Sequence, residues 1–172
     1  MAKKTLALAL LLLSACSLSA AKLVSGVEIL PSVSLNKFES TVSYSTNTEV
    51  GISLCLETGQ RAVFGASAGA EKAVSILNPD RFSSAGDYGG LYLKVFWSLC
   101  SFLTVDAGIR LLVPQAYGSM IIPAFNSGVS FRRTAPLGAS LVLCTGAGVS
   151  VSLGRSFASY RFGFSVMGLW RQ

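Results

Sequence analysis

The sequence predicts an all-β fold, an eight-stranded antiparallel up-and-down transmembrane β-barrel that follows an N-terminal signal peptide. Three observations indicate it. The 172 residues are 51% hydrophobic and only 13% charged. Large apolar residues alternate with small or polar ones in eight stretches. Every charged residue in these stretches lies at the alternate positions that carry the small or polar residues. Short connections alternate with longer ones along the chain. Outer-membrane barrels combine these features.

The first 21 residues predict a secretory signal peptide. Two lysines precede an apolar run over residues 6–13, which is too short to span a bilayer. Small residues follow and permit cleavage before Lys22, which leaves residues 22–172 as a single barrel domain. Without the two leader lysines the net charge falls from +6 to +4 and no basic run remains, so we expect no nucleic-acid partner.

The cysteines allow a second interpretation of the leader. Cys16 ends a Leu-Ser-Ala-Cys stretch that resembles a lipobox, so the alternative is a lipoprotein signal over residues 1–15 with Cys16 lipidated. Cys55, Cys100 and Cys144 are spaced too widely for a metal site, and we interpret them as small buried or interfacial thiols. We therefore expect neither a metal nor a cofactor.

The first four strands are predicted before residue 100. They are the stretches 24–35, 48–57, 61–71 and 91–99. A tight turn joins the second and third at 57–60, and long loops are predicted at 36–47 and 72–90, the latter with Asn-Pro-Asp and Gly-Gly breakers. The apolar residues that set the phase of the four strands are Val27, Ile29, Pro31, Val33 and Leu35; Val50, Ile52, Leu54 and Leu56; Ala62, Phe64, Ala66, Ala68 and Ala70; and Leu91, Leu93, Val95 and Trp97.

The last four strands follow with short connections. They are the stretches 103–113, 120–132, 137–153 and 159–172. Their connections are 99–102, 114–119, 133–136 and 154–158. Their phase is set by Leu103, Val105, Ala107, Ile109, Leu111 and Val113; Ile121, Phe125, Val129 and Phe131; Leu137, Leu141, Leu143, Val149 and Val151; and Tyr160, Phe162, Phe164, Val166 and Trp170.

Two features test this assignment. Residues 134–154 are uncharged over the length of a membrane helix, but glycines after Pro136 and serines at every second position favour a strand. Pro31 and Pro123 lie inside stretches whose N–H groups should pair. Each therefore predicts a bulge, an edge position or a shifted boundary.

The charges test the phase independently, because large apolar residues alone set it. The charged residues of the stretches share the small, polar face: Glu28, Glu49, Glu57, Glu71, Lys94, Asp106, Arg110, Arg132 and Arg161. A charge on the lipid face would cost roughly 2–4 kcal/mol near the midplane. Because eight strands leave room only for side chains inside, we expect a lumen charge network of Glu28, Glu49, Glu71, Lys94, Asp106, Arg110, Arg132 and Arg161. The alternative is a soluble exported barrel or sandwich. In such a fold, however, the face opposite the apolar one should be charged and exposed to solvent.

With this pattern the chain resembles the small eight-stranded outer-membrane barrels, which include the outer-membrane protein W, X and A types. The final strand, YRFGFSVMGLW, resembles the alternating aromatic signal that the barrel assembly machinery reads, although Arg171 and Gln172 follow Trp170. The resemblance implies a monomer in the cell outer membrane, with outer-membrane lipid and the assembly machinery as partners. Tyr160, Trp97 and Trp170 are expected in aromatic girdles at the two membrane interfaces.

Three functions remain open. The first is a non-enzymatic outer-membrane barrel with a structural role or a role in passage of small, including apolar, molecules. The second is a surface adhesin or receptor that acts through the loops 36–47, 72–90 and 154–158. The third is a soluble exported barrel or lipoprotein that binds a small apolar ligand. An enzyme is not expected, because the small-barrel enzymes depend on histidine and this chain has none.

Overall fold

The computed structural model describes residues 22–39, 41–58, 61–77, 87–115 and 120–170. The leader, with Cys16, lies outside the described residues, so the signal peptide and the lipidation stay predictions. Within the described residues the chain forms no helix that is long and apolar enough to cross a membrane.

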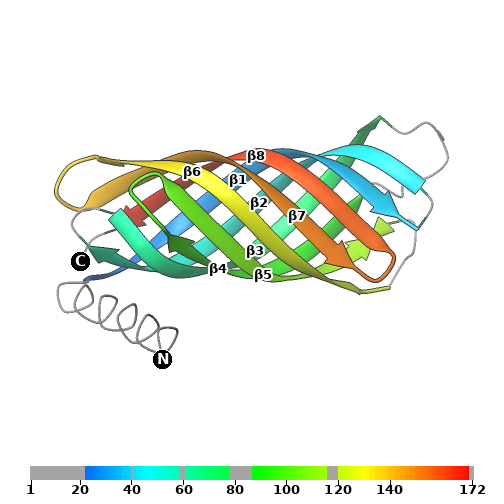
Figure 1. Cartoon of the computed structure of the whole chain (residues 1–172), viewed down its shortest axis with the longest axis horizontal. Coiled ribbons are helices and arrows are strands. Elements are labelled where there is room, and N and C mark those ends of the chain that lie inside the picture. The colour runs from blue at the N-terminus through cyan, green and yellow to red at the C-terminus, as the bar shows by residue number, and fades with distance from the viewer. Residues whose placement is uncertain (1–21, 40, 59–60, 78–86, 116–119, 171–172) are drawn as a thin grey trace, which may run out of the picture.

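Eight antiparallel strands close into a barrel in chain order, which confirms the predicted all-β up-and-down fold (Figure 1). The first residues of β1 and the last residues of β8 pair at one end, which we call the terminal end, and the opposite end is the distal end. The strands are β1 (Lys22–Phe38), β2 (Thr41–Thr58), β3 (Arg61–Leu77), β4 (Tyr88–Ser98), β5 (Leu103–Pro114), β6 (Ile122–Pro136), β7 (Leu141–Gly154) and β8 (Phe157–Trp170).

The stagger of the strands sets the width of the barrel. A path that follows the pairing once around the sheet passes through Glu28, Gly51, Gly69, Tyr92, Arg110, Ala124, Gly154, Phe157 and Phe38. The path leaves β1 at Glu28 and returns at Phe38, ten residues further along. For eight strands this stagger gives a tilt of about 40° and a backbone radius of about 8 Å. Such an interior holds side chains and little else.

Burial follows the predicted phase. In β4, for example, Leu91, Leu93 and Trp97 are exposed, whereas Tyr92 and Lys94 are buried. The same alternation runs along β2, where exposed apolar residues alternate with a buried acid and serines. Apolar side chains therefore cover the outside of the barrel, and polar side chains fill its middle.

Several predicted loops are in fact strand. The loop at 36–47 was wrong, because β1 runs to Phe38 and β2 starts at Thr41. The reason is that Asn36 donates a side-chain hydrogen bond to Ser45, 3.0 Å away, inside the barrel. Polar residues that face a narrow interior have the composition of a loop. The predicted loop at 72–90 also shrinks, since β3 continues to Leu77 and β4 starts at Tyr88.

The predicted connections at 133–136 and 154–158 were also wrong. Residues 133–136 extend β6, and the turn to β7 occupies residues 137–140 instead. Residues 154–158 contain only a two-residue turn at Arg155 and Ser156, with Ser156 at φ 61°. The distal end therefore carries tight turns as well as longer connections, so the simple alternation of short and long connections does not hold.

The longer strands also place three cations on the outer wall. Lys37 in β1, Lys72 in β3 and Arg133 in β6 are exposed and share the parity of the apolar residues. All three lie just beyond the end of a predicted stretch. The exclusion of charge from the outer face holds for the middle of the wall but not for its edges.

The two prolines occupy gaps in the ladders. The β1–β8 ladder omits Leu30 and Pro31 and resumes at Ser32 in unchanged register. The β6–β7 ladder begins at Ala124, one residue after Pro123. Neither proline therefore leaves a bulge, and each missing N–H falls where no ladder bond is made.

Two apolar clusters fill the ends of the interior. The terminal-end cluster consists of Val24, Cys55, Phe96, Val142, Cys144, Met167 and Leu169. The distal-end cluster consists of Phe38, Ala73, Tyr88, Leu112, Ile122, Ala124 and Phe157. On β1, β4 and β8 alike, a buried charge lies between a member of one cluster and a member of the other, namely Glu28, Lys94 and Arg161.

Candidate functional site

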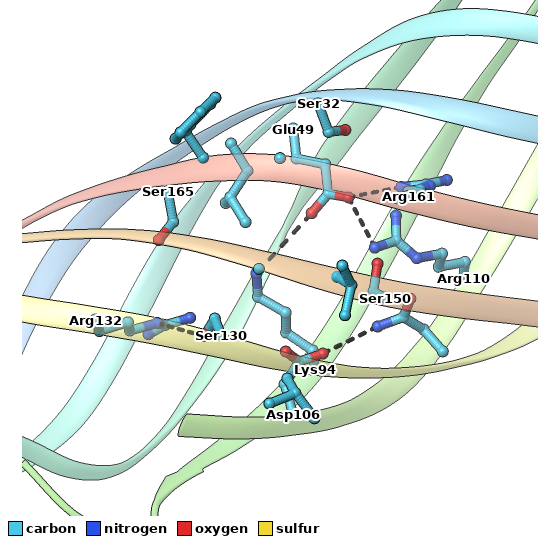
Figure 2. Close-up of a pocket in the computed structure, with 17 residues that line it drawn as sticks. Ser32, Glu49, Lys94, Asp106, Arg110, Ser130, Arg132, Ser150, Arg161 and Ser165 are labelled. Atoms are coloured by element: carbon cyan, nitrogen blue, oxygen red, sulfur yellow. Dashed lines mark hydrogen bonds and ion pairs between the residues drawn. The ribbon is translucent and has the colours of Figure 1, made fainter. Parts of the chain in front are cut away.

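The buried charges in the middle of the barrel form one ion-pair network of three acids and three bases. Arg110 joins Glu49 at 2.7 Å and Glu71 at 2.6 Å. Arg161 joins the same two carboxylates at 2.7 and 2.8 Å. Lys94 contacts Glu28 and lies 3.9 Å from Glu49. Glu49 therefore faces all three cations, as Figure 2 shows.

The sheet register explains why two arginines are needed at the centre. Glu49 on β2 and Glu71 on β3 are directly opposite each other and both face inward. Like charges in that position repel. Arg110 from β5 and Arg161 from β8 each bridge the pair, so four strands are tied together across the interior.

The network is almost fully removed from solvent. None of its six residues is more than 5% exposed. Inside a protein, attraction between paired charges offsets the loss of hydration only when the pairs are complete, and removal of one partner costs about 3–5 kcal/mol. Here the three acids balance the charge of the three bases.

Two tyrosines that were not predicted as part of the network extend it. Arg161 donates to the Tyr88 hydroxyl at 2.6 Å, and Tyr88 makes a long hydrogen bond of 3.5 Å to Asn47. Tyr92 lies under Lys94 and Arg110, with the cations 5.2 and 5.8 Å from its ring centroid. Tyr92 lies at an inward-facing position of its predicted strand, so the sequence could have predicted its contact with the network. Tyr88 lay within a predicted loop, so its contact could not be predicted.

Glycines make room for Tyr92. Gly51 and Gly69 are cross-strand partners, and a Cβ on either would clash with the Tyr92 hydroxyl. The small residues of β2 and β3 therefore allow a large ring to cross the interior and support the cations.

The other two residues of the predicted network, Asp106 and Arg132, do not join it. Asp106 accepts a hydrogen bond from Asn126 at 3.1 Å. Arg132 donates to Ser130 at 3.2 Å, and its guanidinium lies 4.9 Å from the centroid of the Phe96 ring. Among the described residues neither Asp106 nor Arg132 has an ion-pair partner within 4.0 Å.

A small cavity is lined by these two residues and by four members of the network, Glu49, Lys94, Arg110 and Arg161 (Figure 2). Its volume is about 60 Å³, enough for a few water molecules. Serines and glycines of β7 and β8, which include Ser150, Gly163 and Ser165, leave this space. The cavity also reaches Leu30, where the β1–β8 ladder is interrupted.

The predicted girdle residues lie on the outer wall at two levels. Trp97 and Trp170 are about half exposed near the terminal ends of β4 and β8. Tyr160, 57% exposed, lies near the distal start of β8. The three side chains thus divide between the two ends of the barrel.

The described cysteines are free thiols. Cys55 and Cys144 are buried in the terminal-end cluster, and Cys100 is half-buried in the β4–β5 turn. In the described part of the chain, no group of three or more histidine, cysteine, aspartate or glutamate residues is placed to hold a metal ion.

No protein family model matches the chain, and no curated protein is similar to it. The resemblance to the outer-membrane protein W, X and A types therefore rests on the strand pattern and the eight-stranded barrel alone.

Proposed function

We propose that this chain is a non-enzymatic, monomeric barrel of the cell outer membrane, with a structural role in the envelope. The observation that carries the proposal is the outer wall. In the described part of the chain, 34 large apolar side chains are exposed. A soluble monomer rarely exposes an apolar patch of more than a few hundred Å², whereas lipid would cover such a wall.

The height of the wall supports the same proposal. The 11 residues of β4 contain no outward charge and expose Leu91, Leu93, Val95 and Trp97. At the tilt derived above, a strand of this length rises by about 25 Å, the height of the apolar band in outer-membrane barrels. Outward cations such as Lys72 and Arg133 lie toward the edges of this band, where a charge costs little.

The interior favours a structural role over passage of molecules. The ion-pair network lies between two apolar clusters, and the cavity beside it holds only a few waters. A solute would have to displace paired charges and packed rings. Among the barrels that the chain resembles, the X and A types, which imply a role in envelope stability, fit this interior better than the W type.

The alternatives draw less support. A soluble carrier of an apolar ligand needs an apolar cavity. The cavity in the middle of this barrel is lined by six charged residues, Glu49, Lys94, Asp106, Arg110, Arg132 and Arg161. An adhesin needs long loops, but 36–47 and 154–158 are almost entirely strand.

The test is to refold residues 22–172 in detergent and compare unboiled with boiled samples on an SDS gel. A heat-dependent mobility shift, with a β spectrum by circular dichroism and aggregation in plain buffer, is expected. A soluble β monomer in buffer that lacks the shift would reject the membrane barrel.

A further inference from the structure

A hollow on the outer wall lies over β6 and β7 near the terminal end. Its lining includes Phe102, Phe131, Arg133, Thr145, Gly146 and Phe164. The rings of Phe102 and Phe131 are stacked, with centroids 6.3 Å apart and planes 6° apart. Arg133 and Thr145 are cross-strand partners, and both side chains are exposed. The hollow thus combines a cation and a hydroxyl with aromatic walls.

The local fold leaves Arg133 open on one side. β5 begins at Leu103, opposite Phe131, so β6 extends past it toward the terminal end. The β4–β5 turn covers part of that extension, because the N–H of Arg132 donates to the Phe102 carbonyl at 2.7 Å. Arg133 therefore lies beside the Phe102 ring, on a stretch of β6 that pairs with β7 but not with β5.

The Arg133 guanidinium lacks an anionic partner in the described part of the chain, since no side-chain hydrogen bond or ion pair joins it to another described residue. Its surroundings are apolar: Leu99 is 60% and Leu137 55% exposed at the same end. A partner that brings both a negative charge and hydrocarbon is complementary to a guanidinium at the edge of an apolar band.

We propose that the hollow binds one anionic glycerophospholipid. Its phosphate accepts hydrogen bonds from the Arg133 guanidinium and the Thr145 hydroxyl, and an acyl chain lies against Phe131 and Phe164. Planar guanidinium groups pair with phosphate oxygens in a fork geometry that favours such a contact. This inference rests on the proposed membrane location.

Charge distinguishes a lipid from a second copy of this chain. The outward-facing residues of the described strands include lysine and arginine but no acid. The wall of a second copy therefore offers Arg133 no carboxylate. Inorganic phosphate would satisfy the charge, but it would leave the three phenylalanine rings unused.

The experiment measures lipid binding to refolded residues 22–172 by native mass spectrometry in detergent. The probes are dioleoyl phosphatidylglycerol and dioleoyl phosphatidylcholine. The variants are Arg133→Gln and Thr145→Val, and the matched control is Arg155→Gln, which removes an exposed arginine from the distal β7–β8 turn. We expect Arg133→Gln to weaken binding of the first phosphatidylglycerol about tenfold, Thr145→Val to weaken it less and Arg155→Gln to leave it unchanged.

Three results would overturn the lipid site: equal binding by wild type and Arg133→Gln, an equal loss in Arg155→Gln, or displacement of the lipid by millimolar inorganic phosphate. Failure of the wild type to show the heat shift would reject the proposed function and this site together. If every variant shows the shift but binds lipid alike, only the lipid site fails.

Discussion

Replacement of Glu49 by glutamine tests whether the interior network holds the barrel together. Glu49 faces Lys94, Arg110 and Arg161, with its nearest oxygen 2.7 Å from each arginine. Its neutralisation leaves three buried cations with only Glu28 and Glu71. Because Glu49 is 3% exposed, water cannot screen the excess charge. An uncompensated buried charge costs about 3–5 kcal/mol, and at a slope of about 2 kcal/mol per molar urea the midpoint should fall by about 2 M.

The assay is equilibrium urea unfolding in lipid vesicles, followed by the heat-dependent gel shift. The control is Asp106→Asn, because Asp106 accepts one hydrogen bond and makes no ion pair with a described residue; its loss should be about 1 kcal/mol or less. The double variant Glu49→Gln/Arg161→Gln leaves two acids and two bases, so the charges balance again. Its loss of unfolding free energy should be about 1–3 kcal/mol smaller than the sum of the losses in the two single variants. If Glu49→Gln costs no more than Asp106→Asn, the network does not stabilise the fold and the reasoning is refuted.

Three other predictions concern the wall, the interior and the thiols. Leu93→Arg, in the middle of the apolar band, should lower the free energy of unfolding in vesicles by about 2–4 kcal/mol, whereas Val113→Arg at the distal edge should cost about 0–1 kcal/mol; equal small losses would argue for a wall in water. Gly51→Val should destabilise by about 1–3 kcal/mol, since its side chain clashes with Tyr92, and an unchanged urea midpoint would contradict that contact. Cys55, 1% exposed, should react with a maleimide only after unfolding; rapid labelling of Cys55 itself in the folded barrel would show that the terminal end is open.

The face of each strand was predictable because the signal is local. Along a strand, successive side chains point to opposite sides, so Val50 and Ile52 fix the side on which Glu49 lies without reference to any other strand. The number of strands was predictable because this pattern repeats eight times along the chain, and the structure has the eight strands in chain order.

The strand ends were less predictable, because inward polar residues and loop residues have the same composition. Asn36 and Ser45 were assigned to a loop, yet they face each other inside the barrel. The missed segment is strand because β1 and β2 pair as far as Phe38 and Thr41. Likewise, a charge at the end of a stretch, such as Arg133, was taken as a stop although the strand continues outward-facing.

By itself, then, the sequence determined which side chains face inward and that charges of both signs share the interior. Only the tertiary structure decided which charges meet. Glu49 and Arg161 are 112 residues apart, and they pair because the ten-residue stagger brings their side chains to the same level of the barrel. Asp106 faces the same interior and lines the same cavity, but it accepts a hydrogen bond from Asn126 and joins no ion pair with a described residue. Parity is a property of one strand, whereas contact across a barrel depends on the register of all eight.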